Sequence, residues 1–424
     1  MSNMHRRQFL ETTAAGATVA LAGRALRAED TPNNKIAVAI MGVNGRGAGL
    51  ASGFAKLPGC EVAYVCDVDQ HAVDKGVNLI EGLQSRKPEG VTDFRRILDD
   101  KSVDALLIAT PDHWHAPATI LACAAQKHVY VEKPACHNPR EGELMIAAAR
   151  KQNRVVQVGT QRRSSTGIQA GIKRLHDGEI GKVLFARAWI NGARPEIGFG
   201  KPAAPPAHID WTLWQGPAPE SEFHDNYLHY NWHWFWNWGT GELGNNGVHA
   251  LDLCRWGMQV DSPIKVTCGG GKYHFQDDQE TPDTQLATFD FGDRVILWEH
   301  RTWHKRGPEG AGWGAAFYGE KGSMVISDKV AFHDMNSKLL DEAPVNNGEV
   351  EHQQDFLDCI RSGQRPAQDV ESGVQSTMLC LLGNIAYRTG QTVNLDPQTH
   401  QIVDNPQQQA LWSREYRPGW EPTV

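Results

Sequence analysis

Lys133 is the side chain whose surroundings point most directly to chemistry. It belongs to the tripeptide Glu132-Lys133-Pro134, which follows an apolar run at residues 127–131. If that run is a strand of a parallel sheet, Lys133 lies at the carboxyl edge, where open α/β sheets bind their ligands. There its ammonium group can donate a hydrogen bond to a hydroxyl and help to move a proton. Taken alone, such a lysine is more often a surface charge, so the assignment depends on the neighbouring motifs.

A glycine-rich turn is the second feature. Residues 40–47 read Ile-Met-Gly-Val-Asn-Gly-Arg-Gly, where a first apolar strand ends and a helix begins. In such a turn, backbone N–H groups and the helix N-terminus can face a pyrophosphate. The usual pattern is G-x-G-x-x-G; here Asn replaces the middle glycine, and Asn tolerates a positive φ better than most residues. The turn predicts a dinucleotide site made by Gly42, Asn44, Gly45, Arg46 and Gly47.

An acidic residue at the end of the second apolar run supports this prediction. Asp67 follows residues 61–66, and a carboxylate about 20 residues after the turn binds the adenosine ribose hydroxyls. Asp67 and Asp69 have no Arg or Lys beside them, so a 2′-phosphate would be repelled. NAD is therefore favoured over NADP. Asp69 could instead serve only as the N-cap of a helix.

The elements that position these residues alternate regularly in the first part of the chain. Almost continuously apolar strands, each followed by a helix, predict a parallel sheet covered on both faces. We therefore expect a Rossmann domain over residues 34–158. Its strands are predicted at 36–41, 61–66, 105–109, 127–131 and 155–158, and its helices at 48–56, 69–81, 94–98, 117–126 and 140–151.

The pattern changes after residue 159. Longer runs that include 183–190, 264–268 and 315–318 predict the strands of an antiparallel sheet. Two further strands, at 285–291 and 294–302, would be joined by a hairpin turn. We expect an α/β protein whose second domain spans residues 159–395, followed by a tail at 396–424 that wraps onto the body or a neighbouring subunit. Helices are predicted at 167–176, 248–256, 351–362 and 373–388, and a surface loop at 198–222.

Together with the segment Thr110-Pro111-Asp112-His113-Trp114-His115, these motifs resemble those of the Gfo/Idh/MocA family, the relatives of glucose–fructose oxidoreductase and inositol dehydrogenase. The similarity covers nearly all of residues 35–390. It implies a Rossmann domain followed by an α/β domain with a large, open, mostly antiparallel sheet, which often mediates oligomers. It also implies that Lys133 is the family's lysine, with a cis bond to Pro134. Further cofactor contacts are implied for Thr110, Pro111, His115 and Glu132.

The family carries a D-x-x-x-H motif on a helix of the second domain. Residues 244–249, Gly-Asn-Asn-Gly-Val-His, occupy its place, so the resemblance makes His249 the acid/base residue. Asn245 stands where the aspartate would be; it cannot titrate, although it can bind a substrate hydroxyl. The chemistry implied is hydride transfer between a carbinol carbon and nicotinamide C4. His249, with a pKa near neutral, would take the hydroxyl proton and Lys133 would polarise the oxygen. A buried, structural histidine is the alternative.

An aromatic stretch precedes that motif. Residues 230–238 read Tyr-Asn-Trp-His-Trp-Phe-Trp-Asn-Trp. Because the apolar faces of sugars stack on indoles, Trp236 and its neighbours could form a carbohydrate platform. Packing within the second domain or at a subunit interface explains the stretch equally well. Asp252, one turn after His249, is expected to orient that helix or the substrate. Other second-domain candidates for substrate contact are Arg162, Arg163, Tyr273, Trp303, His304 and Lys305.

The N-terminus resembles a twin-arginine (Tat) export signal over residues 1–28. Arg6-Arg7 are followed by Gln8-Phe9-Leu10 and a mildly apolar run at 12–22. A membrane anchor is the alternative, but a spanning helix needs about 20 apolar residues. The formal net charge of −8 offers no basic footprint for nucleic acid. Tat substrates fold in the cytoplasm, so we expect the eight cysteines to be free, and their spacing predicts no zinc or other metal site.

Export separates an enzyme from the cytoplasmic NAD pool. The cofactor must then be bound before export and recycled within each turnover. We therefore expect a periplasmic oxidoreductase in which one sugar or polyol reduces the bound NAD and a second substrate reoxidises it. One alternative is a glycoside-cleaving enzyme that works by transient oxidation and elimination. A second alternative is a sugar-binding protein without turnover. The expected partners are a sugar or glycoside, the Tat machinery and further copies of the chain through the C-terminal sheet.

Overall fold

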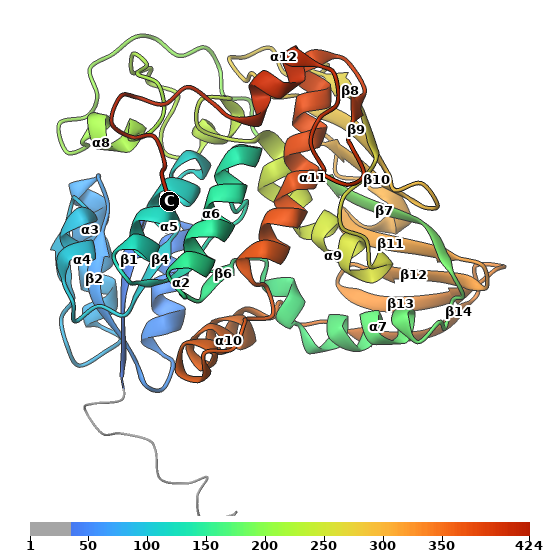
Figure 1. Ribbon diagram of the computed structural model, residues 1–424, viewed down its shortest axis with the longest axis horizontal. Coiled ribbons are helices and arrows are strands. Elements are labelled where there is room, and N and C mark those ends of the chain that lie inside the picture. The colour runs from blue at the N-terminus through green and yellow to red at the C-terminus, as the bar shows by residue number, and fades with distance from the viewer. Residues whose placement is uncertain (1–34) are drawn as a thin grey trace, which may run out of the picture.

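Two β-sheets form the framework of the protein in this computed structural model, which describes residues 35–424 (Figure 1). The helices α9 (Val248–Met258) and α11 (Val370–Thr389) lie between the sheets, and further helices cover both faces of the first sheet. The export signal predicted for residues 1–28 lies outside the described residues. Within residues 35–424, no helix is long and apolar enough to cross a membrane.

The first sheet is parallel and has six strands in the order β3-β2-β1-β4-β5-β6. Its inner strands are apolar and buried on both faces, so the predicted Rossmann architecture is confirmed. Strand β3 was not predicted, because it has three residues and two of them are exposed. The strands are β1 (Ile36–Met41), β2 (Cys60–Cys66), β3 (Glu89–Val91), β4 (Ala105–Ile108), β5 (His128–Val131) and β6 (Val156–Val158), and the helices are α2 (Arg46–Ala55), α3 (Gln70–Glu81), α4 (Arg95–Asp99), α5 (Asp112–Ala124) and α6 (Pro139–Lys151).

The second sheet has nine strands in the order β14-β13-β12-β11-β7-β10-β9-β8-β15. All neighbouring pairs except β7 and β10 are antiparallel, as the fold class predicted. The turn predicted at residues 291–294 joins β9 to β10. Strands β12 to β14 were missed, because they are short and β14 is exposed throughout. The strands are β7 (Val183–Asn191), β8 (Lys265–Gly271), β9 (Thr284–Asp290), β10 (Val295–Arg301), β11 (Trp313–Gly319), β12 (Gly322–Ile326), β13 (Lys329–Asp334), β14 (Leu339–Pro344) and β15 (Val393–Asn394).

The four longest helices after the Rossmann domain are α7 (Thr166–His176), α9 (Val248–Met258), α10 (Glu349–Ser362) and α11 (Val370–Thr389). Helix α11 belongs to both hydrophobic cores. Val370 and Val374 pack in the core of the Rossmann sheet, whereas Leu379 and Leu382 pack in the core of the nine-stranded sheet. The two halves of the chain therefore share one continuous helix, and α10 packs against the Rossmann helix α2.

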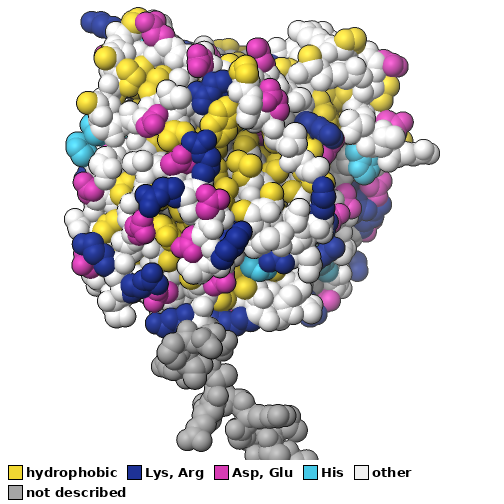
Figure 2. Space-filling view, turned by 60° about the vertical axis from the view of Figure 1, so that its left-hand side comes forward, with side chains coloured by type: hydrophobic (Ala, Val, Ile, Leu, Met, Phe, Trp, Pro, Cys, Tyr) yellow, Lys and Arg dark blue, Asp and Glu magenta, His cyan; other side chains and the backbone are white. Residues whose placement is uncertain are grey.

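The C-terminal tail wraps onto the body of its own chain. The Trp420 ring meets Trp114 of α5 edge-on, with ring centroids 5.2 Å apart. Tyr416 donates a hydrogen bond to the buried Glu141 of α6 (2.9 Å). The sequence left open whether the tail packs on its own chain or on a neighbouring subunit. These contacts show that it packs on its own chain. On the face in Figure 2, basic and acidic side chains are interspersed and form no extended region of one sign.

Candidate active site

A cavity of about 520 Å³ opens at the carboxyl ends of the Rossmann strands. This is the edge at which the sequence placed a ligand site, and the volume suits a small-molecule or cofactor site. The Rossmann domain supplies one wall. The opposite wall comes from residues 192–242, which we call the covering segment, and from Asn245. Residues lining the cavity include Gly42, Asn44, Gly45, Arg46, Asp67, Asp69, Thr110, Pro111, His115, Glu132, Lys133, Ile209, Trp214, His229, Tyr230, His233 and Asn245.

The glycine turn has the shape that a dinucleotide requires. Gly42 has a φ of +84°, and a Cβ on it would lie 2.7 Å from the carbonyl oxygen of Ala109. A Cβ on Gly47 would collide with the carbonyl of Gly42, so the first turn of α2 can approach the strand only because this residue is glycine. Gly45 (φ +63°) has no atom within 4 Å of its Cβ position. The turn thus leaves open space in front of the N-terminus of α2.

Asp67 is held at the end of β2 by the turn itself. Its carboxylate accepts hydrogen bonds from the backbone N–H of Val43 (2.8 Å) and of Asp69 (3.0 Å). Burial raises the pKa of Asp67, and the two backbone bonds oppose that rise. Asp69 caps α3, accepting from the N–H of His71 (2.8 Å). Asp69 thus has the N-cap role considered for it, and ribose binding by Asp67 stays a prediction.

Thr110 and His115 shape the middle of the cavity. The Thr110 hydroxyl is buried and has no hydrogen-bond partner among the described residues, so it is free to contact a ligand. The ring nitrogens of His115 lie 2.6 Å from the carbonyl oxygen of Pro134 and 2.9 Å from that of Thr110. His115 thus ties together two loops of the cavity wall. Together with the glycine turn, the orphaned hydroxyl fits a bound dinucleotide.

Arg46 and Glu132 bind each other. The Arg46 Nε donates to Glu132 (2.6 Å), and its Nη atoms donate to Glu349 of α10 (2.8 and 3.1 Å). Although burial opposes it, the two carboxylates raise the pKa of Arg46. Both residues were predicted to contact the cofactor. Their side chains line the cavity, but their charges neutralise each other in an ion pair. This pair joins the Rossmann sheet to α10.

Lys133 and Asn245 meet at one end of the cavity. The Lys133 Nζ donates to the backbone oxygen of Asn245 (3.0 Å) and to its Oδ1 (3.2 Å). Lys133 follows β5, with the expected cis bond to Pro134, and Asn245 lies in a π-helical turn (Leu243–Gly247) that leads into α9. Residues 112 positions apart in sequence are thereby brought together, as the family resemblance implied.

His249 lies on α9, one turn beyond Asn245. Its Nδ1 is buried and has no partner among the described residues. Burial, together with the nearby charges of Lys133 and Arg162, lowers the pKa of His249 well below its usual value. The expectation of a pKa near neutral was therefore wrong: the imidazole is neutral at physiological pH and is a weak proton acceptor. His249 interacts with Lys133 electrostatically but is not among the residues that line the cavity.

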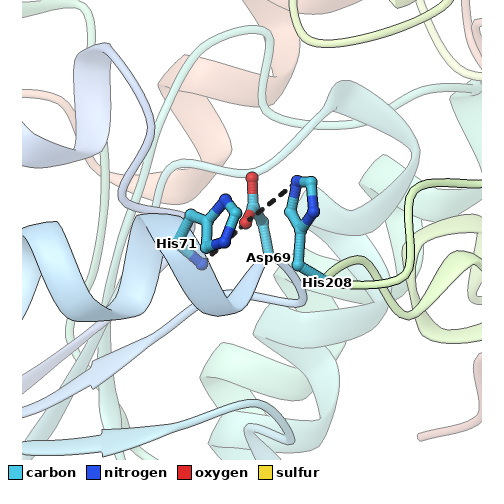
Figure 3. Close-up of side chains that lie close together, drawn as sticks. All are labelled: Asp69, His71 and His208. Atoms are coloured by element: carbon cyan, nitrogen blue, oxygen red, sulfur yellow. Dashed lines mark hydrogen bonds and ion pairs between the residues drawn. The ribbon is translucent and has the colours of Figure 1, made fainter.

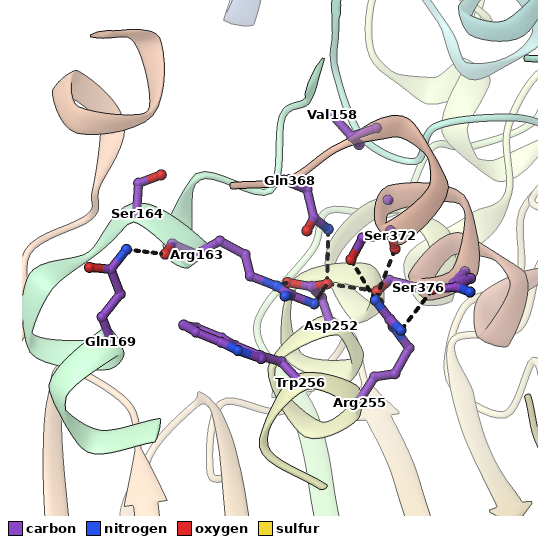
Figure 4. Close-up of polar contacts among 12 residues, drawn as sticks. Val158, Arg163, Ser164, Gln169, Asp252, Arg255, Trp256, Gln368, Ser372 and Ser376 are labelled. Atoms are coloured by element: carbon purple, nitrogen blue, oxygen red, sulfur yellow. Dashed lines mark hydrogen bonds and ion pairs between the residues drawn. The ribbon is translucent and has the colours of Figure 1, made fainter. Parts of the chain in front are cut away.

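Asp252 is a structural residue, which corrects the expectation that it could contact the substrate. Its carboxylate is fully buried and accepts two hydrogen bonds from Arg163 (both 2.9 Å). Gln368 (2.9 Å) and Ser376 (2.6 Å) donate two more (Figure 4). Although burial opposes it, Arg163 lowers the pKa of Asp252. The carboxylate joins α9 to the start of α11, and Asp252 is not among the residues that line the cavity.

None of the other predicted substrate residues lines the cavity; they are Arg162, Arg163, Trp236, Tyr273, Trp303, His304 and Lys305. Arg162 stacks on Trp313, with its guanidinium carbon 3.9 Å from the ring centroid. The Trp236 ring faces the guanidinium of Arg388 on α11. Tyr273 and His304 are exposed, because they lie in loops at the edge of the sheet. These side chains were predicted from their residue types alone, and the fold places them away from the cavity.

The aromatic stretch serves mainly as packing. Trp214, Trp232, Phe235 and Trp238 form a small hydrophobic core of the covering segment. From the stretch itself, only Tyr230, Trp232 and His233 also line the cavity. Burial lowers the pKa of His233 to about 3, so this imidazole is neutral. The covering segment contributes the residues that sequence reasoning missed, and its loops carry no periodic signal that could have found them.

The covering segment is attached to the Rossmann domain beside Asp67. The N–H of Gln70 donates to the carbonyl of His208 (2.9 Å), and that of Asp210 donates to the carbonyl of Val68 (2.9 Å). The His208 ring stacks on His71, with centroids 3.9 Å apart and planes inclined by 17°, and both rings lie near Asp69 (Figure 3). An imidazole binds a metal in the plane of its ring, and two nearly parallel rings do not direct their lone pairs at one point. The arrangement suits a closure over the adenosine end of the cavity better than a metal site.

Comparison with known proteins identifies the class to which this fold and site belong. Residues 36–160 match the oxidoreductase family with an NAD-binding Rossmann fold, and residues 199–422 match the C-terminal α/β domain of the same family. The chain belongs to the Gfo/Idh/MocA oxidoreductase family. Its first domain is the NAD-binding Rossmann fold of that family.

Individual relatives match only part of the chain. A glycosyl hydrolase family 109 protein of Saccharopolyspora erythraea is 32% identical over 185 residues, which are 42% of this chain and 39% of the relative. A levoglucosan dehydrogenase of Pseudarthrobacter phenanthrenivorans is 27% identical over 165 residues, 39% of this chain and 35% of the relative. The chain thus matches well under half the length of these relatives. A levoglucosan dehydrogenase structure in complex with NADH and levoglucosan has the same fold (TM-score 0.67, 17% identity, 86% of this chain and 100% of that one).

Proposed function

We propose that this protein is an exported, NAD-dependent oxidoreductase that transfers hydride to or from a carbinol carbon of a sugar or polyol and retains its cofactor. The observation that carries the proposal is the contact between Lys133 and Asn245 at one end of the dinucleotide cavity. A hydroxyl bound there would meet an ammonium donor and an amide side chain. When bound, the nicotinamide cofactor accepts or supplies the hydride.

The protein's own groups handle the substrate oxygen. The Lys133 ammonium is the one unpaired cation of the Rossmann wall among the described residues that line the cavity, because Arg46 is bound by Glu132 and Glu349. Lys133 can donate to the substrate oxygen and stabilise the negative charge that develops as the O–H bond breaks. Asn245 holds the ammonium in place through two acceptors. The neutral His249 adds no competing positive charge beside Lys133.

NAD is favoured as the cofactor because the adenosine end of the cavity is acidic. Asp67, Asp69 and Asp93 line it. A 2′-phosphate would meet these carboxylates. Arg46, the arginine that lines the cavity, is already neutralised by its ion pairs, and Arg95 is bound to Asp93. Retention of the cofactor is supported by the covering segment, which is hydrogen-bonded across the cavity beside Asp69. The twin-arginine sequence at residues 6–7 supports export.

Glycoside cleavage through transient oxidation is the second candidate. It is supported by the similarity to a glycosyl hydrolase family 109 protein and to an α-N-acetylgalactosaminidase of Shewanella oneidensis. Oxidation of a ring carbon makes the neighbouring C–H acidic, so that a base close to that carbon could eliminate the aglycone. A site of this kind would return the cofactor to its starting state after each turnover.

The test begins with protein purified from the periplasm. Absorbance and fluorescence of reduced nicotinamide, before and after addition of single sugars, show whether the cofactor is retained and which sugar reduces it. Reoxidation by a second sugar supports the first candidate, and aglycone release without net NADH change supports the second. Protein that carries no nucleotide, binds none and turns over no sugar or glycoside contradicts both and supports the non-catalytic alternative. An Arg6→Lys, Arg7→Lys variant should remain in the cytoplasm.

Association of several copies through the nine-stranded sheet also belongs to the proposal. Leu184 and Leu286 lie on the sheet face that the helices leave open and are 44% and 48% exposed. Light scattering coupled to size-exclusion chromatography measures the number of copies. A Leu184→Lys, Leu286→Lys variant should dissociate into monomers, whereas a wild type that is already monomeric contradicts this part of the proposal.

A further inference from the structure

Tyr230 lies in the covering segment, at the same end of the cavity as Lys133. It lines the cavity and is 47% exposed. Its hydroxyl oxygen receives a hydrogen bond from Arg194 Nη1 (3.0 Å) and a longer one from Asn245 Nδ2 (3.4 Å). Because Asn245 also accepts from Lys133, the three side chains form one hydrogen-bonded chain across the cavity.

The Tyr230 hydroxyl accepts hydrogen bonds but donates none to the described residues. A tyrosine hydroxyl has one hydrogen to donate and two lone pairs to accept with. Both lone pairs of Tyr230 are engaged by Arg194 and Asn245. Among the described residues, no acceptor receives the hydrogen of Tyr230. That hydrogen is therefore available to an oxygen atom bound in the cavity.

Arg194 is fixed so that it keeps facing this oxygen. Its Nη2 donates to both carboxylate oxygens of Glu242 (3.1 and 3.2 Å), and Glu242 is almost fully buried. Two donors aimed at one oxygen stabilise the negative charge that remains when its proton leaves, and preorganised donors need no rearrangement to do so. The ion pair with Glu242 thus keeps the Arg194 guanidinium on the Tyr230 oxygen.

The two residues of the family motif are unsuited to this task. Asn245, which replaces the acid of the family motif, cannot titrate, and His249 does not line the cavity. We propose that Tyr230 is the residue that exchanges a proton with the substrate oxygen, with Lys133 polarising that oxygen. This inference rests on the proposed oxidoreductase function and adds the residue that completes it.

The step balances as follows. Before oxidation, the half-exposed Tyr230 releases its hydroxyl proton to solvent. The tyrosinate oxygen then takes the proton of the substrate O–H as the C–H bond breaks. The hydride, with its two electrons, passes to NAD⁺, and the C–O single bond becomes a carbonyl. In reduction, the Tyr230 hydroxyl gives its proton to the carbonyl oxygen as the hydride arrives from NADH. Arg194 is a positioning residue, since it acts through the tyrosine.

The test uses the full-length protein with the sugar that reduces the wild-type cofactor. Tyr230→Phe keeps the ring and removes the hydroxyl. Because general acid–base catalysis contributes roughly 10² to 10⁴ in rate, kcat/KM should fall by at least about 10²-fold. The Kd for NADH, measured by fluorescence, should stay within about twofold of wild type, and the pH dependence of kcat should lose one ionisation. Tyr64→Phe is the matched control, because that hydroxyl bonds only to Asp100 in the Rossmann domain.

Arg194→Lys provides a second measurement, because it preserves the charge beside the buried Glu242. It should lower kcat by a smaller factor and move the pH profile, without changing the Kd for NADH. The inference is overturned if Tyr230→Phe retains more than half of the wild-type kcat/KM and an unchanged pH profile. If the wild type itself reduces no cofactor with any sugar, the proposed function fails instead. Binding of the sugar to the NADH complex, followed by calorimetry, still reports whether the Tyr230 hydroxyl contacts it.

Discussion

Substitution of Asp252 by Asn tests whether this carboxylate is structural or contacts the substrate. The change leaves Arg163, whose side chain is 10% exposed, without an anionic partner, and it replaces an acceptor by an N–H₂ group that faces other donors. Breaking a buried ion pair by removing one partner costs about 3–5 kcal/mol. We therefore expect the free energy of unfolding to fall by about that amount, with activity per folded molecule nearly unchanged.

The assay is urea unfolding followed by tryptophan fluorescence, together with steady-state kinetics. Asp177→Asn is the control, because Asp177 forms an exposed i,i+4 pair with Lys173 on α7; exposed pairs of this kind contribute about 0.3–0.5 kcal/mol. Adding Arg163→Met to Asp252→Asn removes the unpaired cation and should restore part of the lost stability. The reasoning is refuted if Asp252→Asn unfolds like the wild type while KM for the sugar rises.

The pH dependence of stability gives an independent check on the same pair. Arg163 lowers the pKa of Asp252 in the folded protein below that of an unfolded carboxyl. The carboxylate therefore contributes its full stabilisation above the unfolded pKa of about 3.9, and loses it as the pH falls through the lower, folded pKa. Wild type and Asp252→Asn should differ in stability at neutral pH and converge in acid. Equal differences at all pH values would contradict the assignment.

Three further changes test the cofactor end and the catalytic end of the cavity. Gly42→Ala places a Cβ 2.7 Å from the Ala109 carbonyl oxygen. It should weaken NADH binding on the order of 10-fold or more, as measured by fluorescence titration. Gly49→Ala is the control, because its Cβ would meet no atom within 4 Å, and it should leave NADH binding unchanged. Lys133→Met should lower kcat/KM by roughly 10² to 10⁴ with little change in the Kd for NADH, and the exposed Lys75→Met serves as its control. Asp67→Asn should raise the preference for NADPH over NADH by about 10-fold or more; an unaltered cofactor ratio would refute the ribose role.

The sequence by itself determined those parts of the protein that depend on local patterns. Continuous apolar runs predicted the parallel Rossmann strands, because a strand covered on both faces has no polar side. The positions of Gly42 and Asp67 were readable for a similar reason: a positive φ and a strand end are properties of a few consecutive residues. Lys133 followed from its place directly after β5. Each of these features lies within one strand–turn–helix unit.

The tertiary structure alone decided which distant side chains meet, and in what state. Asp252 was expected to orient its helix or the substrate, but Arg163 and the first turns of α11 surround it. His249 was expected to titrate near neutrality, and burial beside Lys133 makes it neutral. Tyr230 was only one member of an aromatic stretch until the fold placed its hydroxyl between Arg194 and Asn245. Desolvation and hydrogen-bond geometry depend on neighbours from the whole chain, and no local pattern encodes them.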